Sequence, residues 1–341
     1  MIVLFLAFCC LLFKGSKLFI NGFNKDFISK QQSTIINGFF ALIVLFSHFS
    51  HYVNPESVFD VALVKLMNNI SQLMVTTFLF FSGYGIFESI KNKKDYLKNF
   101  LSHRLLPVWF NLSISVTLYL IMNLLFKIKY STFSIIFAFT GYTNVGTSNW
   151  YIFITIILYL LTMFSFSNAI SKGNYKRAIL IFVLFSALFI GIFGLFMPNY
   201  FVNTLMCFSF GMIFSLLKDS TLPFIIKRYY IVFFALICIF VFMFVLKKQV
   251  KINNNIYYNL LSIIFVSCII MFMLKVSFNN AFFEFLGRYV FWIYTLQRIP
   301  MIIFQNIVHN NYLYFLICFS ITLLLSFFAD KLSKFALKKG N

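Results

Sequence analysis

Arg298 is the side chain in this chain that most invites a chemical explanation. It lies in the string IYTLQRIPMII, within the otherwise uncharged stretch from Tyr289 to Ala329. A charge inside a membrane span is costly, and such residues usually mark substrate, ion or proton sites. Snorkelling to the interface, or pairing with backbone carbonyls of the bundle, is the structural alternative. We therefore take Arg298 as a catalytic candidate and its neighbour Gln297 as a candidate substrate-binding residue.

A second candidate lies in the segment STIINGFFALIVLFSHFSHY, which carries His48 and His51. The two are three residues apart and share a helix face. Histidine within a span is rare and often handles protons. At 1.5 Å per residue, His48 is roughly 20 Å into this span, whereas His51 falls at its outer interface. We predict that His48 is the catalytic residue and His51 a bystander; the alternative is two interfacial histidines bonded to nearby backbone.

The composition requires a membrane protein. Mean hydropathy is +0.91, and 61% of the 341 residues are hydrophobic while 11% are charged. The uncharged runs from Lys129 to Lys172 and from Arg177 to Lys218 are each long enough for two spans. The net charge of +20 sits between apolar segments, as the positive-inside rule expects, and does not indicate nucleic-acid binding. The six cysteines lie in apolar stretches without metal-ligand or disulfide spacing, so we expect no metal.

The predicted fold class is all-α, a polytopic transmembrane helix bundle. Residues 1–30 form an N-terminal hydrophobic helix and basic linker, since they lack the features of a cleaved signal peptide, and residues 31–341 form one transmembrane domain. The ten predicted core spans are 35–53, 70–90, 105–126, 150–167, 178–197, 200–217, 229–246, 257–274, 289–308 and 312–329.

The apolar piece 131–142 is about a dozen residues, too short for a simple span. If it does not cross, about 21 basic residues face the cytoplasm and about six face outward. If it crosses, the split becomes about 12 and 15, which is no bias. We therefore predict a re-entrant segment, with both ends of the core cytoplasmic, in a multi-pass protein of the cell membrane.

Five stretches in order resemble the acyltransferase-3 family of integral-membrane acyltransferases. The segment from Gly38 to His48 is similar to the family's first core helix, in which a histidine ends an apolar run. The other four are FLFFSGYGIF (78–87), YLKNFLSHRLLPVWF (96–110), SNWYIFITIILYLL (148–161) and FFEFLGRYVFWIYTLQRIPMIIF (282–304). The resemblance covers about residues 30–330.

The resemblance implies transfer of an acyl group, usually acetyl from acetyl-CoA, to a carbohydrate hydroxyl. By position, His48 matches the family's essential histidine, Arg104 a basic residue of its cytoplasmic loop, and Ser82 the serine of a Ser-Gly step. Two positions depart from the pattern. Asn37 stands where the family has Arg or Lys, and Thr155 stands where many members have an acid.

The spacing suits a long thioester donor. Asn37 and His48 are eleven residues apart, which places them on one helix face and roughly 16 Å apart along it. The basic residues Lys94, Lys98 and Arg104 are expected to bind the CoA phosphates; the alternative is an ordinary positive-inside loop.

On the acceptor side, His48 is expected to act as general base, or less readily as a transient acyl carrier. Arg298, Gln297 or Asn37 would stabilise the oxyanion. Trp150 and Tyr151 would stack on the sugar, or simply anchor a span at the interface.

The expected partners are a glycan or glycolipid acceptor, acyl-CoA as co-substrate, and membrane lipid, with no nucleic acid. A lipid-linked oligosaccharide transporter or polysaccharide polymerase is the first alternative, although we find no paired half-repeats with broken helices. A non-catalytic acyltransferase-like protein is the second, and Asn37 is its main support. The acceptor sugar, the acyl chain length and the oligomeric state are left open.

Overall fold

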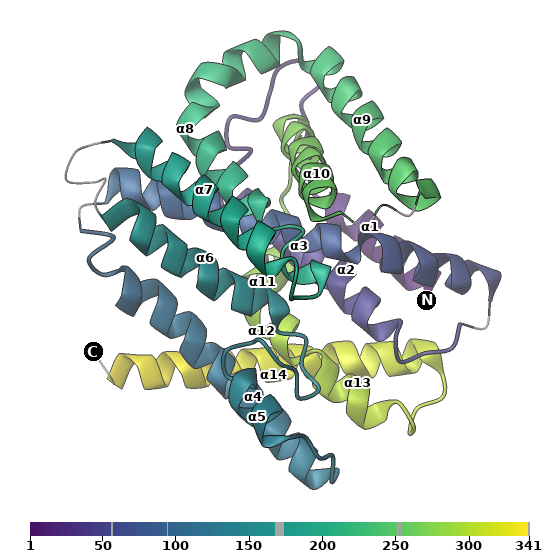
Figure 1. Cartoon of the computed structure of the whole chain (residues 1–341). Coiled ribbons are helices and arrows are strands. Elements are labelled where there is room, and N and C mark those ends of the chain that lie inside the picture. The colour runs from purple at the N-terminus through teal and green to yellow at the C-terminus, as the bar shows by residue number, and fades with distance from the viewer. Residues whose placement is uncertain (56, 94, 168–173, 251, 253, 340–341) are drawn as a thin grey trace.

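A computed structural model describes residues 1–339 apart from 56, 94, 168–173, 251 and 253. The predicted all-α polytopic fold is confirmed (Figure 1). Within the described residues, nine helices are long and apolar enough to cross a membrane. They are α2 (Lys30–Phe49), α3 (Val58–Asn92), α4 (Leu106–Leu125) with the π-helical turn η1 (Leu101–Leu105), α6 (Trp150–Ser167), α7 (Tyr175–Phe193), α8 (Met206–Lys227) with the short helix η3 (Asn199–Phe201), α9 (Tyr229–Val250), α10 (Asn255–Lys275) and α14 (Asn311–Lys339).

The span predicted at 289–308 is a broken helix. It consists of α12 (Val290–Leu296) and α13 (Arg298–Phe304), each of seven residues. Pro300 has no N–H, so the carbonyl of Leu296 lacks its usual helical donor. Gln297 sits at the break, and its Nε2 donates to the carbonyl of Tyr294 at 3.1 Å. Breaks of this kind at membrane depth occur where the backbone is buried in protein or lines a cavity.

The segment predicted to be re-entrant contains only one short helix, α5 (Thr132–Ala138). Seven helical residues span about 10 Å, far less than a bilayer core. The indole N–H of Trp109, on α4, donates to the carbonyl of Phe139, which follows α5, at 3.1 Å. The chain then turns through Gly141 and Gly146, both with positive φ, into α6.

The N-terminal helix α1 (Ile2–Phe13) leads into the basic linker, which is tied to the far end of α10. Strand β1 (Lys17–Leu18) pairs antiparallel with β2 (Val276–Ser277). The side-chain amide of Gln32 makes two hydrogen bonds to the backbone of Phe278, at 2.7 and 2.8 Å. These contacts fix the start of α2 against the segment that leads into α11 (Ala281–Arg288).

Two helix crossings are so close that only glycine fits. Where α2 crosses α11, a Cβ on Gly38 would lie 2.0 Å from a facing carbonyl oxygen, and one on Gly287 would lie 1.9 Å away. Where α3 crosses α8, the same distances are 2.1 Å at Gly83 and 2.2 Å at Gly211. Small residues of this kind let helix backbones approach closely in membranes. The first crossing also fixes the position of α2 relative to α12, because α12 follows α11 directly in the chain.

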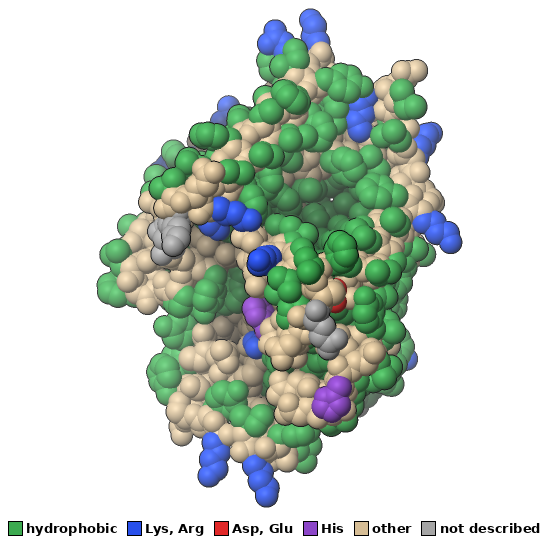
Figure 2. Space-filling view, turned by 90° about the vertical axis from the view of Figure 1, so that its right-hand side faces the viewer, with side chains coloured by type: hydrophobic (Ala, Val, Ile, Leu, Met, Phe, Trp, Pro, Cys, Tyr) green, Lys and Arg blue, Asp and Glu red, His purple; other side chains and the backbone are tan. Residues whose placement is uncertain are grey.

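The surface is that expected for lipid exposure. Figure 2 shows the right-hand side of the molecule as drawn in Figure 1, where hydrophobic side chains cover much of the surface and wall a hollow, while most Lys and Arg side chains project at its edges. Helix α9 lies at the edge of the bundle (Figure 1), where it packs against α10 through Phe240 and Phe265, and most of its apolar side chains are not buried. These features agree with a multi-pass membrane protein.

Candidate active site

A cavity of about 410 Å³ lies between α2, α3, the η1–α4 segment, α6 and α12; we call it the inner cavity. Helix periodicity explains the α2 wall, since Lys30, Ser33 and Asn37 are spaced three and four residues apart on one face. Five residues singled out from the sequence line this cavity: Asn37, Ser82, Arg104, Tyr151 and Thr155.

One end of the inner cavity is basic. Lys30 and Arg104 are exposed there. Arg104 belongs to the π-helical turn, in which the N–H of Leu106 bonds the carbonyl of Leu101, five residues earlier. Such turns are frequent at functional sites. The Nε of Arg104 donates to the hydroxyl of Tyr96 at 2.9 Å, which holds the guanidinium at the cavity mouth.

A second cavity of about 860 Å³ lies beyond Tyr96, around the loop that follows α3; we call it the loop cavity. Lys91, Lys93 and Lys98 line it. Lys98 is exposed and pairs with Asp95 at 2.7 Å. Lys94, the other predicted phosphate ligand, lies outside the described residues. Tyr96 lines the loop cavity and bonds Arg104, so it connects the two basic regions.

His48 and Arg298 are brought together by reciprocal contacts across two helices. The His48 ring lies 6.2 Å from the ring of Tyr294, which precedes Arg298 by four residues. The Nε of Arg298 donates to the hydroxyl of Tyr52 at 2.9 Å, and Tyr52 follows His48 by four residues. The two predicted catalytic residues therefore share one region, whereas His51 is exposed.

Several buried polar atoms in this region have no hydrogen-bond partner among the residues that the structure describes. The Nδ1 of His48 is buried without a hydrogen bond among the described residues, and so is the Oε1 of Gln297. Arg298 also donates through a terminal guanidinium nitrogen to the carbonyl of Thr147 at 3.1 Å. Two residues later, Asn149 is 2% exposed, and neither polar atom of its side chain has a partner within the described chain. We call His48, Thr147, Asn149, Gln297 and Arg298 the polar cluster.

Unpaired buried polar atoms are costly, at about 1–3 kcal/mol each. A ligand that supplies several hydroxyl groups would satisfy them. The guanidinium has five N–H donors, so its contacts with Tyr52 and Thr147 leave donors for such a ligand.

The inner cavity and the polar cluster meet at Tyr294 but are not continuous. His48 does not line the inner cavity, whereas Tyr294 lines it and also faces the His48 ring. Tyr151 is at the same end of the cavity. Trp150, predicted as a stacking platform for sugar, is not part of the cavity wall; its ring packs against Tyr200 at 5.7 Å.

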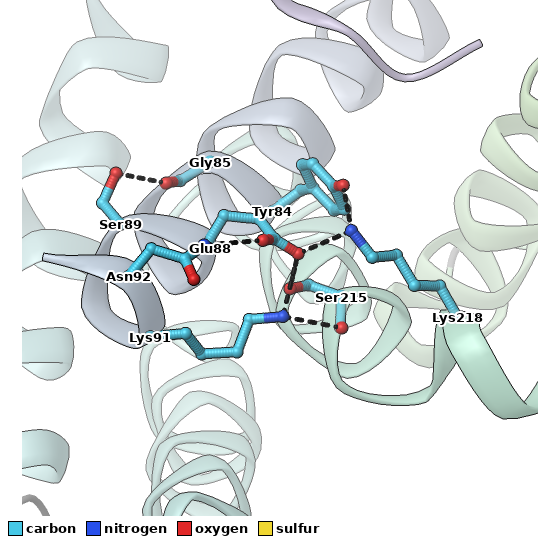
Figure 3. A network of polar contacts seen from close by, with 8 residues as sticks. All are labelled: Tyr84, Gly85, Glu88, Ser89, Lys91, Asn92, Ser215 and Lys218. Carbon is cyan, nitrogen blue, oxygen red and sulfur yellow. Dashed lines mark hydrogen bonds and ion pairs between the residues drawn. The ribbon is translucent and has the colours of Figure 1, made fainter. Parts of the chain in front are cut away.

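A charged network between α3 and α8 was not anticipated from the sequence (Figure 3). The Oε1 of Glu88 accepts from Lys91 at 2.9 Å, from Lys218 at 2.8 Å and from the hydroxyl of Ser215 at 2.7 Å. Lys218 also donates to the hydroxyl of Tyr84 at 2.7 Å. Glu88 itself was the available signal, because it is one of eight acidic residues and falls inside the span predicted at 70–90.

Other residues missed by the sequence reasoning are Tyr52, Tyr96, Thr147 and Tyr294. Spacing could have indicated two of them, because Tyr52 and Tyr294 are each four residues from a predicted catalytic residue, which in an uninterrupted helix would place them on its face. Tyr96 and Thr147 lie outside the long helices, where periodicity gives no signal.

The chain was compared with known protein families, curated proteins and solved structures. A family model described as an acyltransferase domain matches residues 34–331. Neither the curated proteins nor the solved structures that were compared with the chain gave a match. The matched range includes the polar cluster and, apart from Lys30 and Ser33, the wall of the inner cavity.

Proposed function

Because the chain belongs to the acyltransferase domain family, we propose that this membrane acyltransferase moves an acetyl group from acetyl-CoA to a sugar hydroxyl. The acceptor would be a cell-surface polysaccharide or its lipid-linked precursor, and the protein would lie in the cell membrane. One observation carries the proposal: a cavity runs from the basic pair Lys30 and Arg104 to Tyr294, behind which His48 and Arg298 lie.

The basic end of the inner cavity suits the phosphates of CoA. Arg104 and Lys30 offer charge-assisted hydrogen bonds at the mouth, and Lys91, Lys93 and Lys98 surround the adjoining loop cavity. The flexible arm of the donor would follow the inner cavity past Asn37 and place its thioester beside Tyr151 and Tyr294. Asn37 offers an amide in place of the family's positive charge, and its buried Oδ1 has no hydrogen bond within the described chain.

The polar cluster suits the acceptor. Its unpaired polar atoms match the several hydroxyl groups of a sugar, and Arg298 can hold one of them. The attacking hydroxyl would give its proton to His48 as its oxygen bonds to the thioester carbonyl carbon. The carbon–sulfur bond then breaks, and the proton passes from His48 to the thiolate of CoA. Arg298 would stabilise the negative charge that develops on the carbonyl oxygen.

The test compares acyl esters on the cell-surface glycan in three strains: one with the intact gene, one without it, and one with His48→Ala. We expect O-acetyl groups only with the intact gene. His51→Ala is the matched control, because His51 belongs to the same segment but is exposed, and it should retain the ester. Esters that persist without the gene or with His48→Ala would contradict the proposal. Loss of the whole glycan, rather than of its esters, would instead favour transport or polymerisation.

A further inference from the structure

The inner cavity is closed at its deep end by two tyrosine rings. Tyr151 and Tyr294 both line the cavity, and their rings pack edge to face with centroids 5.5 Å apart. Phe78 packs edge to face against the other side of Tyr151 at 6.0 Å. The wall is therefore aromatic and continuous from α3 through α6 to α12.

His48 lies beyond this wall. The face of α2 that carries Lys30, Ser33 and Asn37 continues through Ala41 and Val44 to His48. The first three residues line the cavity, whereas Ala41 and Val44 are buried in the core and do not. On α2 the cavity wall thus ends at Asn37, roughly 16 Å along the helix from His48, whereas Tyr294 on α12 extends the wall toward the histidine.

Tyr294 lies between the inner cavity and His48. Among the described residues that line the cavity, it is the one whose ring packs against His48, at 6.2 Å and an interplanar angle of 52°. Its backbone carbonyl accepts from the Gln297 amide at the helix break, so its position on α12 is held. The ring is 5% exposed. An acyl group that reaches the end of the cavity must therefore meet this ring before it meets the histidine.

Building on the proposed function, we infer that Tyr294 sets the acyl-chain length of the donor. With the donor arm in the inner cavity, the acyl group is its leading end and points at the wall formed by Tyr151 and Tyr294. In this arrangement a two-carbon acyl group extends least far toward the ring. Each additional methylene must displace a buried aromatic side chain, so the donor is restricted to short acyl-CoA.

The test measures binding of non-hydrolysable thioether analogues of acyl-CoA with two, four and six acyl carbons to the purified full-length protein. We expect the wild-type affinity to fall by about tenfold or more across this series, since a single misfit methylene in a pocket typically costs at least that. Tyr294→Ala should flatten the series, and Tyr294→Phe should keep it, because the ring rather than the hydroxyl forms the wall. Phe291→Ala is the matched control: it enlarges the same cavity from the same helix, one turn nearer the mouth, and should keep the wild-type series.

The ratio of affinities across the series is the decisive quantity, because loss of folded protein lowers all signals together and leaves the ratio unchanged. Tyr294→Leu gives the same comparison with a smaller packing defect. Equal wild-type affinity for all three lengths, or equal flattening in Tyr294→Ala and Phe291→Ala, would overturn the inference and leave the proposed function standing. A protein that binds none of the CoA compounds would overturn both.

Discussion

Replacing Gly38 with alanine tests the crossing that positions the candidate site. The new Cβ would lie 2.0 Å from the carbonyl oxygen of Phe283 and 2.7 Å from the backbone nitrogen of Gly287. Both are backbone atoms and cannot rotate away. Since a carbon–oxygen contact needs about 3.3 Å, α2 and α11 must separate by about 1.3 Å. Overpacking of this kind costs about 1–3 kcal/mol, so we expect a lower thermal midpoint.

Acyl-transfer activity should fall as well as stability. His48 and Asn37 belong to α2, whereas Tyr294 and Arg298 follow α11 in the chain. Separating α2 from α11 therefore shifts the histidine relative to the arginine. A misplacement of 1 Å in an active site can reduce the rate by about 10²-fold. We expect Gly38→Ala to lose about that much acyl transfer.

The assay combines thermal unfolding in detergent with transfer activity of the same preparation. Gly85→Ala is the matched control, because nothing lies within 4 Å of the Cβ that it adds inside α3. Alanine is favoured over glycine in a helix by about 1 kcal/mol, so this variant should be as stable as the wild type or more so. If Gly38→Ala matched Gly85→Ala in stability and activity, the close crossing of α2 and α11 would be wrong.

Three further predictions concern charged side chains. Arg298→Lys should lose most acyl transfer, because one ammonium cannot reproduce a planar guanidinium that bonds two groups at once. Arg298→Leu should lose acyl transfer with an unchanged or higher thermal midpoint, since a costly charge is removed from the membrane. Wild-type rates in either variant would show that Arg298 has no catalytic role. Glu88→Leu should lower stability by up to ~3 kcal/mol in denaturant unfolding, because it leaves two partly buried lysines unpaired; an unchanged midpoint would show that the network of Figure 3 contributes nothing. A cysteine at Lys176 should react with impermeant reagents only from the cytoplasm, and labelling from outside would mean that 131–142 crosses the membrane.

The helices could be predicted from the sequence because the bilayer imposes length and composition on each of them separately. A span needs about 20 apolar residues whose backbone groups bond within the helix, and both properties are read from one segment. The short helix at Thr132–Ala138 follows the same logic, since its apolar stretch is too brief to cross. The break at Gln297 could not be predicted with the same ease. Pro300 was visible, but whether a proline kinks or interrupts a helix depends on which neighbours satisfy the freed backbone groups.

The candidate site could likewise be predicted only in part from the sequence. Spacing placed Asn37 and His48 on one face of α2, and the structure keeps them there. Spacing could not show that the cavity stops near Asn37, because the wall comes from Tyr151 and Tyr294 on two other helices. Nor could it show that Lys98 would pair with Asp95 while Arg104 lined the cavity.

The sequence by itself determined that this is an all-α membrane protein with an acyltransferase pattern, because hydropathy and motif spacing are properties of local segments. Only the tertiary structure decided that His48 meets Tyr294 and that Tyr52 bonds Arg298, about 250 residues away. Those contacts depend on how closely helices approach, which the glycines at 38 and 287 permit only as a pair facing across the crossing of α2 and α11. The close approach of two helices depends on both segments together, so it cannot be inferred from either segment alone.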